Sequence, residues 1–193
     1  MPERIKVGDR IGPRTLAGVR GETAPVPDPA GLLHVQFRRF AGCPVCNLHL
    51  RSVVRRHDEI VAAGVREVVL FHAPDEDLRP HVADMPFPVV GDPDKRLYRE
   101  FGVESSRWAL VDPRVWGAIL RGVAVSLWSV VRRRGAVPKL LPHGGRNGLP
   151  ADFLIAPDGT VLAARYGTHI YDQWSVDELL ELARRPVPPG EAA

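Results

Sequence analysis

The segment of residues 32–64 constrains the fold most, because it joins a short apolar run to a helical pattern through two closely spaced cysteines. Residues 32–37 have the length and composition of a buried central strand. From Pro44 the apolar residues recur at helical intervals, and proline suits a first helical turn because its missing N–H is not needed there. Cys43 and Cys46 are therefore expected at a junction between a strand and a helix.

The rest of the chain alternates between strand-like and helix-like patterns, which is typical of an α/β layer structure. The predicted strands are 65–72, 88–90, 151–155 and 160–164. The predicted helices are 44–64, a short helix opened by residues 74–77, one from 92 to about 101, and one from 175 to about 184. Three prolines in residues 23–31 predict a loop there. Pro157-Asp158-Gly159 predicts a hairpin turn, and Ser175 followed by Glu178 is close to a capping box.

Residues 113–148 are less regular and are expected to form an insertion. Between 116 and 131 the apolar residues fit one helical stripe, which three arginines follow. Such a stripe packs on the sheet, forms a dimer interface, or lies on a membrane surface. We favour packing or dimerisation, so a homodimer is one expected partner. With 193 residues, we expect a single domain over 1–185 and a disordered, proline-rich tail over 186–193.

Composition excludes some functional classes. The net charge of +3 is spread along the chain, and no nucleic-acid-binding motif is present. The sequence has no signal-peptide pattern and no run of about 18 uncharged apolar residues, so we expect a cytoplasmic protein without a membrane span. In a reducing compartment, two cysteines three residues apart indicate redox or metal chemistry more than a structural disulfide.

Four segments together resemble the thioredoxin fold and, within it, the peroxiredoxin-like branch called the alkyl hydroperoxide reductase and thiol-specific antioxidant family. They cover nearly the whole chain: Val7-Gly8-Asp9 with Leu16 and Gly18 to Gly21; Phe37 to Cys46; Met85 to Pro93 with Leu97 to Val103; and Gly148 to Ile155 with Pro157-Asp158-Gly159. The resemblance implies a three-layer fold with a central mixed sheet flanked by helices. The 113–148 insertion would precede a strand that follows a cis-proline.

The same resemblance implies an enzyme that reduces a peroxide or a disulfide with cysteine thiols. It needs no prosthetic cofactor, and an external reductant, either a thioredoxin-like protein or a small thiol, closes the cycle. A helix N-terminus lowers a thiol's pKa, so both Cys43 and Cys46 are expected to be activated there. By analogy with thioredoxins, Cys43 would attack and Cys46 would resolve. By analogy with peroxiredoxins, Cys46 would attack and Cys43 would resolve. The more exposed N-terminal position favours Cys43 as the attacking residue.

The sequence departs from the peroxiredoxin pattern around the cysteines. Aligning Cys46 with the peroxide-reacting cysteine puts Arg39 where that family has proline and Cys43 where it has a hydroxyl residue. The arginine that steadies the peroxide in that family has two candidates here, Arg146 and Arg165. We therefore predict catalytic Cys43 and Cys46, with Arg39 and Arg146 among the substrate-binding residues.

The thioredoxin likeness adds a second substrate-binding element at Leu149 and Pro150. The match Gly-Leu-Pro-Ala-Asp-Phe-Leu-Ile predicts a cis peptide bond before Pro150, although few X–Pro bonds in folded proteins are cis. In thioredoxin-like proteins the residue before this proline, here Leu149, offers backbone hydrogen bonds to the substrate chain.

Other interpretations of the same residues stay open. Cys43, Cys46 and His49 follow one another at intervals of three and could share a helical face, but zinc prefers four ligands and no second Cys-x-x-Cys is present, so we assign no metal. A cluster shared across a dimer, a non-catalytic module and a specialised biosynthetic enzyme remain alternatives. His49 and His57 are expected on the helix surface. Arg38 and Arg39 either steady a thiolate or form a solvated strand end.

Overall fold

A five-stranded mixed sheet organises the structure, a computed structural model that describes residues 3–40, 44–103 and 148–185. Its strand order is β5-β4-β3-β6-β7. β3 pairs in parallel with β4, and β4 with β5, whereas β6 runs antiparallel to both β3 and β7. The bounds of these strands are β3 Leu32–Arg38, β4 Val65–Phe71, β5 Val89–Gly91, β6 Ala151–Ile155 and β7 Val161–Tyr166. The predicted central mixed sheet is confirmed.

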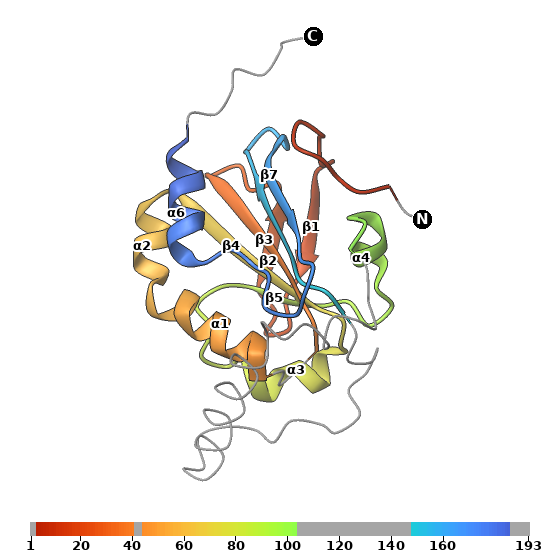
Figure 1. Cartoon of the computed structure of the whole chain (residues 1–193). Coiled ribbons are helices and arrows are strands. Elements are labelled where there is room, and N and C mark those ends of the chain that lie inside the picture. The colour runs from red at the N-terminus through yellow and green to blue at the C-terminus, as the bar shows by residue number, and fades with distance from the viewer. Residues whose placement is uncertain (1–2, 41–43, 104–147, 186–193) are drawn as a thin grey trace.

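Helices cover one face of this sheet, and a second apolar layer covers the other. Figure 1 shows α1, α2 and α6 on one side and α4 on the other. A two-stranded sheet, β1-β2, also packs on the α4 side through Ala24 and Val26. The bounds are α1 Pro44–Arg55, α2 His57–Ala62, α3 Asp75–Val82, α4 Arg96–Glu100, α6 Val176–Arg184, β1 Arg14–Ala17 and β2 Thr23–Val26. The three layers expected from the sequence are therefore present.

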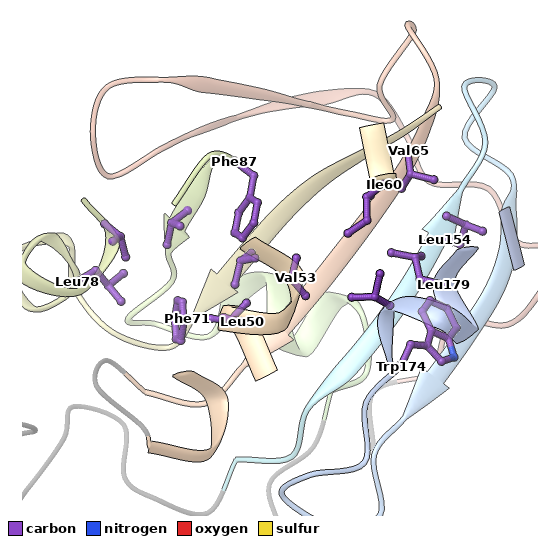
Figure 2. Packing of buried hydrophobic residues seen from close by; sticks show 14 of the residues in the cluster. Leu50, Val53, Ile60, Val65, Phe71, Leu78, Phe87, Leu154, Trp174 and Leu179 are labelled. Carbon is purple, nitrogen blue, oxygen red and sulfur yellow. The ribbon is translucent and has the colours of Figure 1, made fainter. Parts of the chain in front are cut away.

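The core between the sheet and α1, α2 and α6 is built from apolar side chains of all these elements. Figure 2 shows this cluster, with Leu50 and Val53 of α1 over the sheet and Leu179 of α6 nearby. On the other face of the sheet, the rings of Phe37 and Phe153 pack edge-to-face against each other, with ring centroids 5.8 Å apart, in the cluster that includes Tyr98 of α4. Burial on both faces fixes the position of the central strand β3, and with it the start of α1.

The N-terminal region corrects one prediction. Residues 23–31 were expected to form a loop, but β2 occupies Thr23–Val26 and pairs antiparallel with β1. Pro25 lies opposite Thr15 in this pairing. Proline is tolerated because the two-stranded sheet has only edge strands, where a missing N–H need not break a ladder.

The long helix predicted over residues 44–64 is divided at Arg56. α1 ends at Arg55 and α2 begins at His57, because Arg56 has non-helical backbone angles, φ −112° and ψ 19°. The Arg56 guanidinium binds the carboxylates of Glu59 and Asp177, which lie on α2 and α6. This bend brings Ile60 of α2 into the core, where it is fully buried.

The C-terminal elements agree with the sequence patterns. β6 and β7 form the predicted hairpin, and the capping box is complete: the Ser175 side chain accepts from the Glu178 N–H, and the Glu178 side chain accepts from the Ser175 N–H.

The helix predicted from residue 92 is shorter than expected, since α4 spans Arg96–Glu100. Asp92 still caps it by accepting hydrogen bonds from the N–H groups of residues 96 and 97.

Several predictions concern residues outside the described part of the chain. They are Cys43, Arg146, residues 113–147 of the 113–148 insertion, the apolar stripe within it and the 186–193 tail. Among the residues that the structure does describe, no helix is both long enough and apolar enough to cross a membrane.

Candidate active site

Cys46 lies in the first turn of α1, just beyond the carboxyl end of β3. The predicted junction between strand and helix is thus confirmed for this cysteine. Its residue is 2% exposed, so the side chain points into the protein rather than into solvent. Because parallel strands β3, β4 and β5 end at the same edge of the sheet, the residues that follow them gather around this turn.

Arg39 and His72 follow β3 and β4 at this edge. The N–H of His72 donates to the carbonyl oxygen of Arg39 at 3.2 Å, which ties the two strand ends together. Both residues are buried, and the Arg39 guanidinium lies 5.3 Å from the centre of the Phe40 ring. Arg39 is therefore not part of a solvated strand end.

The segment leading into β6 approaches the same edge. A Cβ added to Gly148 would lie 2.9 Å from Cε1 of His72 and 3.6 Å from Cγ of Arg39, so only a glycine lets the backbone pass this closely. Leu149 is half-buried and Pro150 is buried. The structure thus brings three of the predicted substrate-binding residues, Arg39, Leu149 and Pro150, to one end of the sheet.

The predicted cis peptide bond before Pro150 is wrong. Within the described residues the cis bond is Val26–Pro27, and the Leu149–Pro150 bond is trans. The chain at Pro150 already runs as an extension of β6, and the Pro150 carbonyl accepts a hydrogen bond from the N–H of Gly167 at 2.9 Å. A trans bond lets the backbone enter the strand in line, which removes the need for the less favourable isomer.

Tyr98 of α4 supports the strand ends from the opposite face of the sheet. Its buried hydroxyl donates to the carbonyl oxygens of Arg38 and Leu70, the last of these at 2.9 Å. Burial raises the pKa of Tyr98 well above its usual range, and the charges of Asp92 and Cys46 raise it further. Cys46 is therefore within electrostatic range of the hydroxyl that holds the end of β3.

A buried polar network lies directly under α1, and sequence reasoning missed it. Residues 32–37 were interpreted as an apolar run, but the α1-facing side of β3 carries His34, Gln36 and Arg38. Nη2 of Arg38 donates to Oδ1 of Asp152 at 2.7 Å and to Oε1 of Gln36 at 2.6 Å. Both Arg38 and Asp152 have fully buried side chains. The alternation of polar residues with Leu33, Val35 and Phe37 was the available signal.

His49 belongs to this network, which corrects its predicted place on the helix surface. It is 5% exposed, and its Nε2 lies 3.2 Å from Nη2 of Arg38. Burial, followed by the charge of Arg38, lowers the pKa of His49 to about 3. Arginine has no acceptor, so a neutral His49 ring is best placed with the lone pair of Nε2 toward the guanidinium. His49 lies three residues after Cys46, on the same face of α1.

His34 lies between two buried carboxylates. Its Nδ1 is 3.1 Å from Oε1 of Glu67, and its Nε2 is 3.2 Å from Oδ1 of Asp152. Burial favours the neutral ring, but the hydrogen bonds to Asp152 and Glu67 outweigh it and raise the pKa of His34. Burial also opposes ionisation of Asp152, yet the charge of Arg38 and the contact with His34 hold the pKa of that carboxyl well below its usual range.

His57 of α2 completes the network at its outer end. Its side chain is 20% exposed, so the predicted surface position is only partly right. Nδ1 of His57 lies 3.8 Å from Oε2 of Glu67. Among the described residues, neither of these two atoms has a hydrogen-bond partner.

The other predicted ligands and cations are placed elsewhere. Arg165, a candidate for steadying a peroxide, instead binds Glu178 of α6 at 2.9 Å. Among the described residues, no three His, Cys, Asp or Glu side chains are grouped so that they could hold a metal. The Nε2 atom of His49 is taken by Arg38, which removes it as a ligand beside Cys46.

The sheet order, the helix that starts beyond β3 and the layers on both faces define a thioredoxin-like protein. Comparisons of sequence and structure agree with this fold. The family described as AhpC/TSA antioxidant enzyme matches residues 52–169, and the chain belongs to this family. It is thus a peroxiredoxin-like enzyme of the thiol oxidoreductase class. The matched residues begin after both cysteines, so the family match does not itself cover Cys43 and Cys46.

Solved structures show the same fold. Peroxidoxin BcpB from Mycobacterium tuberculosis superposes with a TM-score of 0.64 at 18% identity, covering 94% of this chain and 97% of that one. A structure described as a thiol:disulfide interchange protein DsbE from Chlorobium tepidum superposes with a TM-score of 0.58 at 18% identity, covering 93% of this chain and 99% of that one. Peroxiredoxin Q from Xanthomonas campestris gives 0.60 at 16% identity, covering 89% of each chain. No curated protein matches the chain in sequence.

Proposed function

We propose that this protein reduces a peroxide or a disulfide through Cys43 and Cys46, as a single thioredoxin-like domain over residues 1–185. The observation that carries the proposal is the position of Cys46, in the first turn of α1 at the sheet edge where β3 and β4 end. Backbone N–H groups at such a helix start are without intrahelical partners and favour a thiolate. The sulfurs themselves supply the chemistry, so no prosthetic group is required.

The cycle balances with an external thiol reductant. A cysteine thiolate attacks one oxygen of a hydroperoxide, so an S–O bond forms, the O–O bond breaks, and the alcohol or water leaves with a proton. The second cysteine then attacks the sulfenic sulfur, forming the Cys43–Cys46 disulfide and releasing water. Two thiols of a thioredoxin-like protein or a small-molecule reductant return two electrons and two protons, and become a disulfide. With a disulfide substrate, the first step instead forms a mixed disulfide and releases a thiol.

We assign the attack to Cys43 and the resolving step to Cys46. The support is the burial of Cys46, which is 2% exposed and so poorly placed to meet a substrate first. A resolving thiol needs to reach only the neighbouring sulfur, and the three-residue spacing at a helix start allows this.

We further propose that Arg39, Leu149 and Pro150 contact the substrate, with Arg146 as a fourth contact predicted from sequence alone. The approach of Gly148 to Arg39 and His72 supports this, because it places the β6 entry segment beside the end of β3. A guanidinium here would steady a developing anion, and the half-buried Leu149 would offer backbone groups to an extended partner chain.

Mass spectrometry during titration tests the function. Wild-type protein treated with hydrogen peroxide, and separately with a small disulfide, should lose two hydrogen atoms as one intramolecular disulfide forms. Cys43→Ser and Cys46→Ser should each abolish turnover with a thiol reductant. Val61→Ala, at an exposed position on α2, serves as the control and should keep full turnover. Retention of turnover by either serine variant would reject the mechanism.

A further inference from the structure

The polar network under α1 contains several buried charged side chains, and their charges need to balance because no solvent reaches them. The side chains of Arg38, Glu67 and Asp152 are fully buried. Two carboxylates and one guanidinium leave one negative charge over, and an unbalanced charge in a protein interior is strongly unfavourable. Protonated His34 supplies the missing positive charge, because it contacts both carboxylates.

The geometry of His34 favours the same charge state. An imidazolium donates from both ring nitrogens and satisfies both carboxylates, at 3.1 and 3.2 Å. A neutral ring would turn one nitrogen lone pair toward a carboxylate oxygen, which is repulsive. The raised pKa of His34 agrees with this.

Because of the groups around it, His34 is the residue of this network that gains or loses a proton. Glu67 faces it from β4, Asp152 from β6, and Arg38 lies on the same strand. His49 of α1 is neutral, and His57 of α2 meets the far oxygen of Glu67. The Trp174 ring also lies 5.6 Å from the His34 ring, and the charges of Arg165 and Glu178, on β7 and α6, are paired with each other.

Arg38 connects the network to Cys46. Its guanidinium binds His49, one turn along α1 from Cys46, and its carbonyl accepts from the Tyr98 hydroxyl. The charge of Cys46 acts on that same hydroxyl. Buried charges are only weakly screened, so a change in the net charge of the network changes the electrostatic potential at the buried Cys46.

We propose that His34 is a positioning residue whose charge sets how readily Cys46 ionises. While His34 is protonated the network is neutral and does not oppose a Cys46 thiolate. Once His34 loses its proton the network carries a net negative charge, which disfavours the thiolate. The inference rests on the proposed function in one respect, namely that Cys46 acts as a thiol.

Alkylation of Cys46 tests this without any turnover. In a Cys43→Ser background, the rate of reaction with iodoacetamide is followed by mass spectrometry from pH 5 to pH 9.5, values chosen to span the ordinary histidine and thiol ranges. Histidine ring signals in NMR spectra of the same protein locate the His34 titration. We expect His34 to titrate above about pH 6.5, and the alkylation profile to bend at the same pH.

Variants separate charge from structure. His34→Gln leaves the network negative, so alkylation at neutral pH should slow about tenfold, as a one-unit rise in the thiol pKa implies. Adding Glu67→Gln restores the balance of Arg38 with Asp152 and should restore the rate. His81→Gln, which removes a half-buried histidine of α3 outside the network, should change nothing. Circular dichroism confirms that each variant is folded.

Two results would overturn the inference. One is an alkylation profile unchanged by His34→Gln, and the other is a double variant as slow as the single one. Failure of the proposed function is distinguishable, because it would appear as absent peroxide and disulfide turnover while the alkylation profile still followed His34.

Discussion

Replacing Asp152 by asparagine removes the carboxylate that balances Arg38 under α1 while keeping the shape of the side chain. Both partners are fully buried and 2.7 Å apart, so the variant leaves a buried guanidinium without its counter-charge. Breaking one side of such a pair costs about 3–5 kcal/mol. Because domains of this size are stable by only about 5–15 kcal/mol, Asp152→Asn should fold but unfold at a much lower urea concentration.

A matched control lies on the surface of the same molecule. Arg56 and Asp177 are also 2.7 Å apart, but their side chains are 33% and 83% exposed. Asp177→Asn should therefore leave the urea midpoint within error, because solvent screens an exposed pair. Urea unfolding of both variants, followed by circular dichroism, compares the same chemical change at the same separation with and without water.

The pH dependence of the unfolding free energy tests independently whether the Asp152 carboxylate stabilises the fold. The pKa of Asp152 is lowered in the folded state, so its stabilising effect is present above its unfolded pKa of about 3.9 and is lost as pH falls through the folded value. Asp152 also raises the pKa of His34, so the gap in stability between wild type and Asp152→Asn should widen as pH falls from 7 through about 6.5, and it should shrink below about pH 4. Equal losses in Asp152→Asn and Asp177→Asn, or a gap that keeps widening below about pH 4, would refute the reasoning.

Three further predictions concern stability, each measurable by urea or thermal unfolding. Leu50→Ala removes a core side chain of α1 that is 1% exposed and should cost about 2–5 kcal/mol, whereas the exposed Val61→Ala should cost almost nothing. Ser175→Ala removes the side-chain cap of α6 and should cost about 1 kcal/mol; no loss would mean that the capping box adds nothing. Gly159→Ala should cost more than about 1 kcal/mol, because φ is +89° and the new Cβ would lie 2.5 Å from the Ile11 carbonyl oxygen; unchanged stability would show that the turn relaxes freely.

Local patterns were enough for the elements that their own residues specify. The apolar run at 32–37, the proline that opens α1, the hairpin around Pro157–Gly159 and the Ser175–Glu178 box all depend on neighbours a few residues apart. The order of these elements pointed to the thioredoxin-like fold. It also placed Cys46 at the junction of strand and helix.

Features that depend on distant partners were missed. β2 contains a proline and became recognisable only through its pairing with β1. The trans bond before Pro150 follows from the direct entry into β6, which no local pattern expresses. His49 looked like a helix-surface residue because its partner, Arg38, comes from the strand beneath it.

The sequence by itself determined that Cys46 stands where a central strand passes into a helix, because strand and helix propensities and turn chemistry act over short distances. Only the tertiary structure decided what lies under that helix. His34 meets Glu67 and Asp152 across separations of 33 and 118 residues. Such contacts exist only once the strands are side by side, and the energy of a buried charge depends on which opposite charges the fold brings within a few ångströms of it.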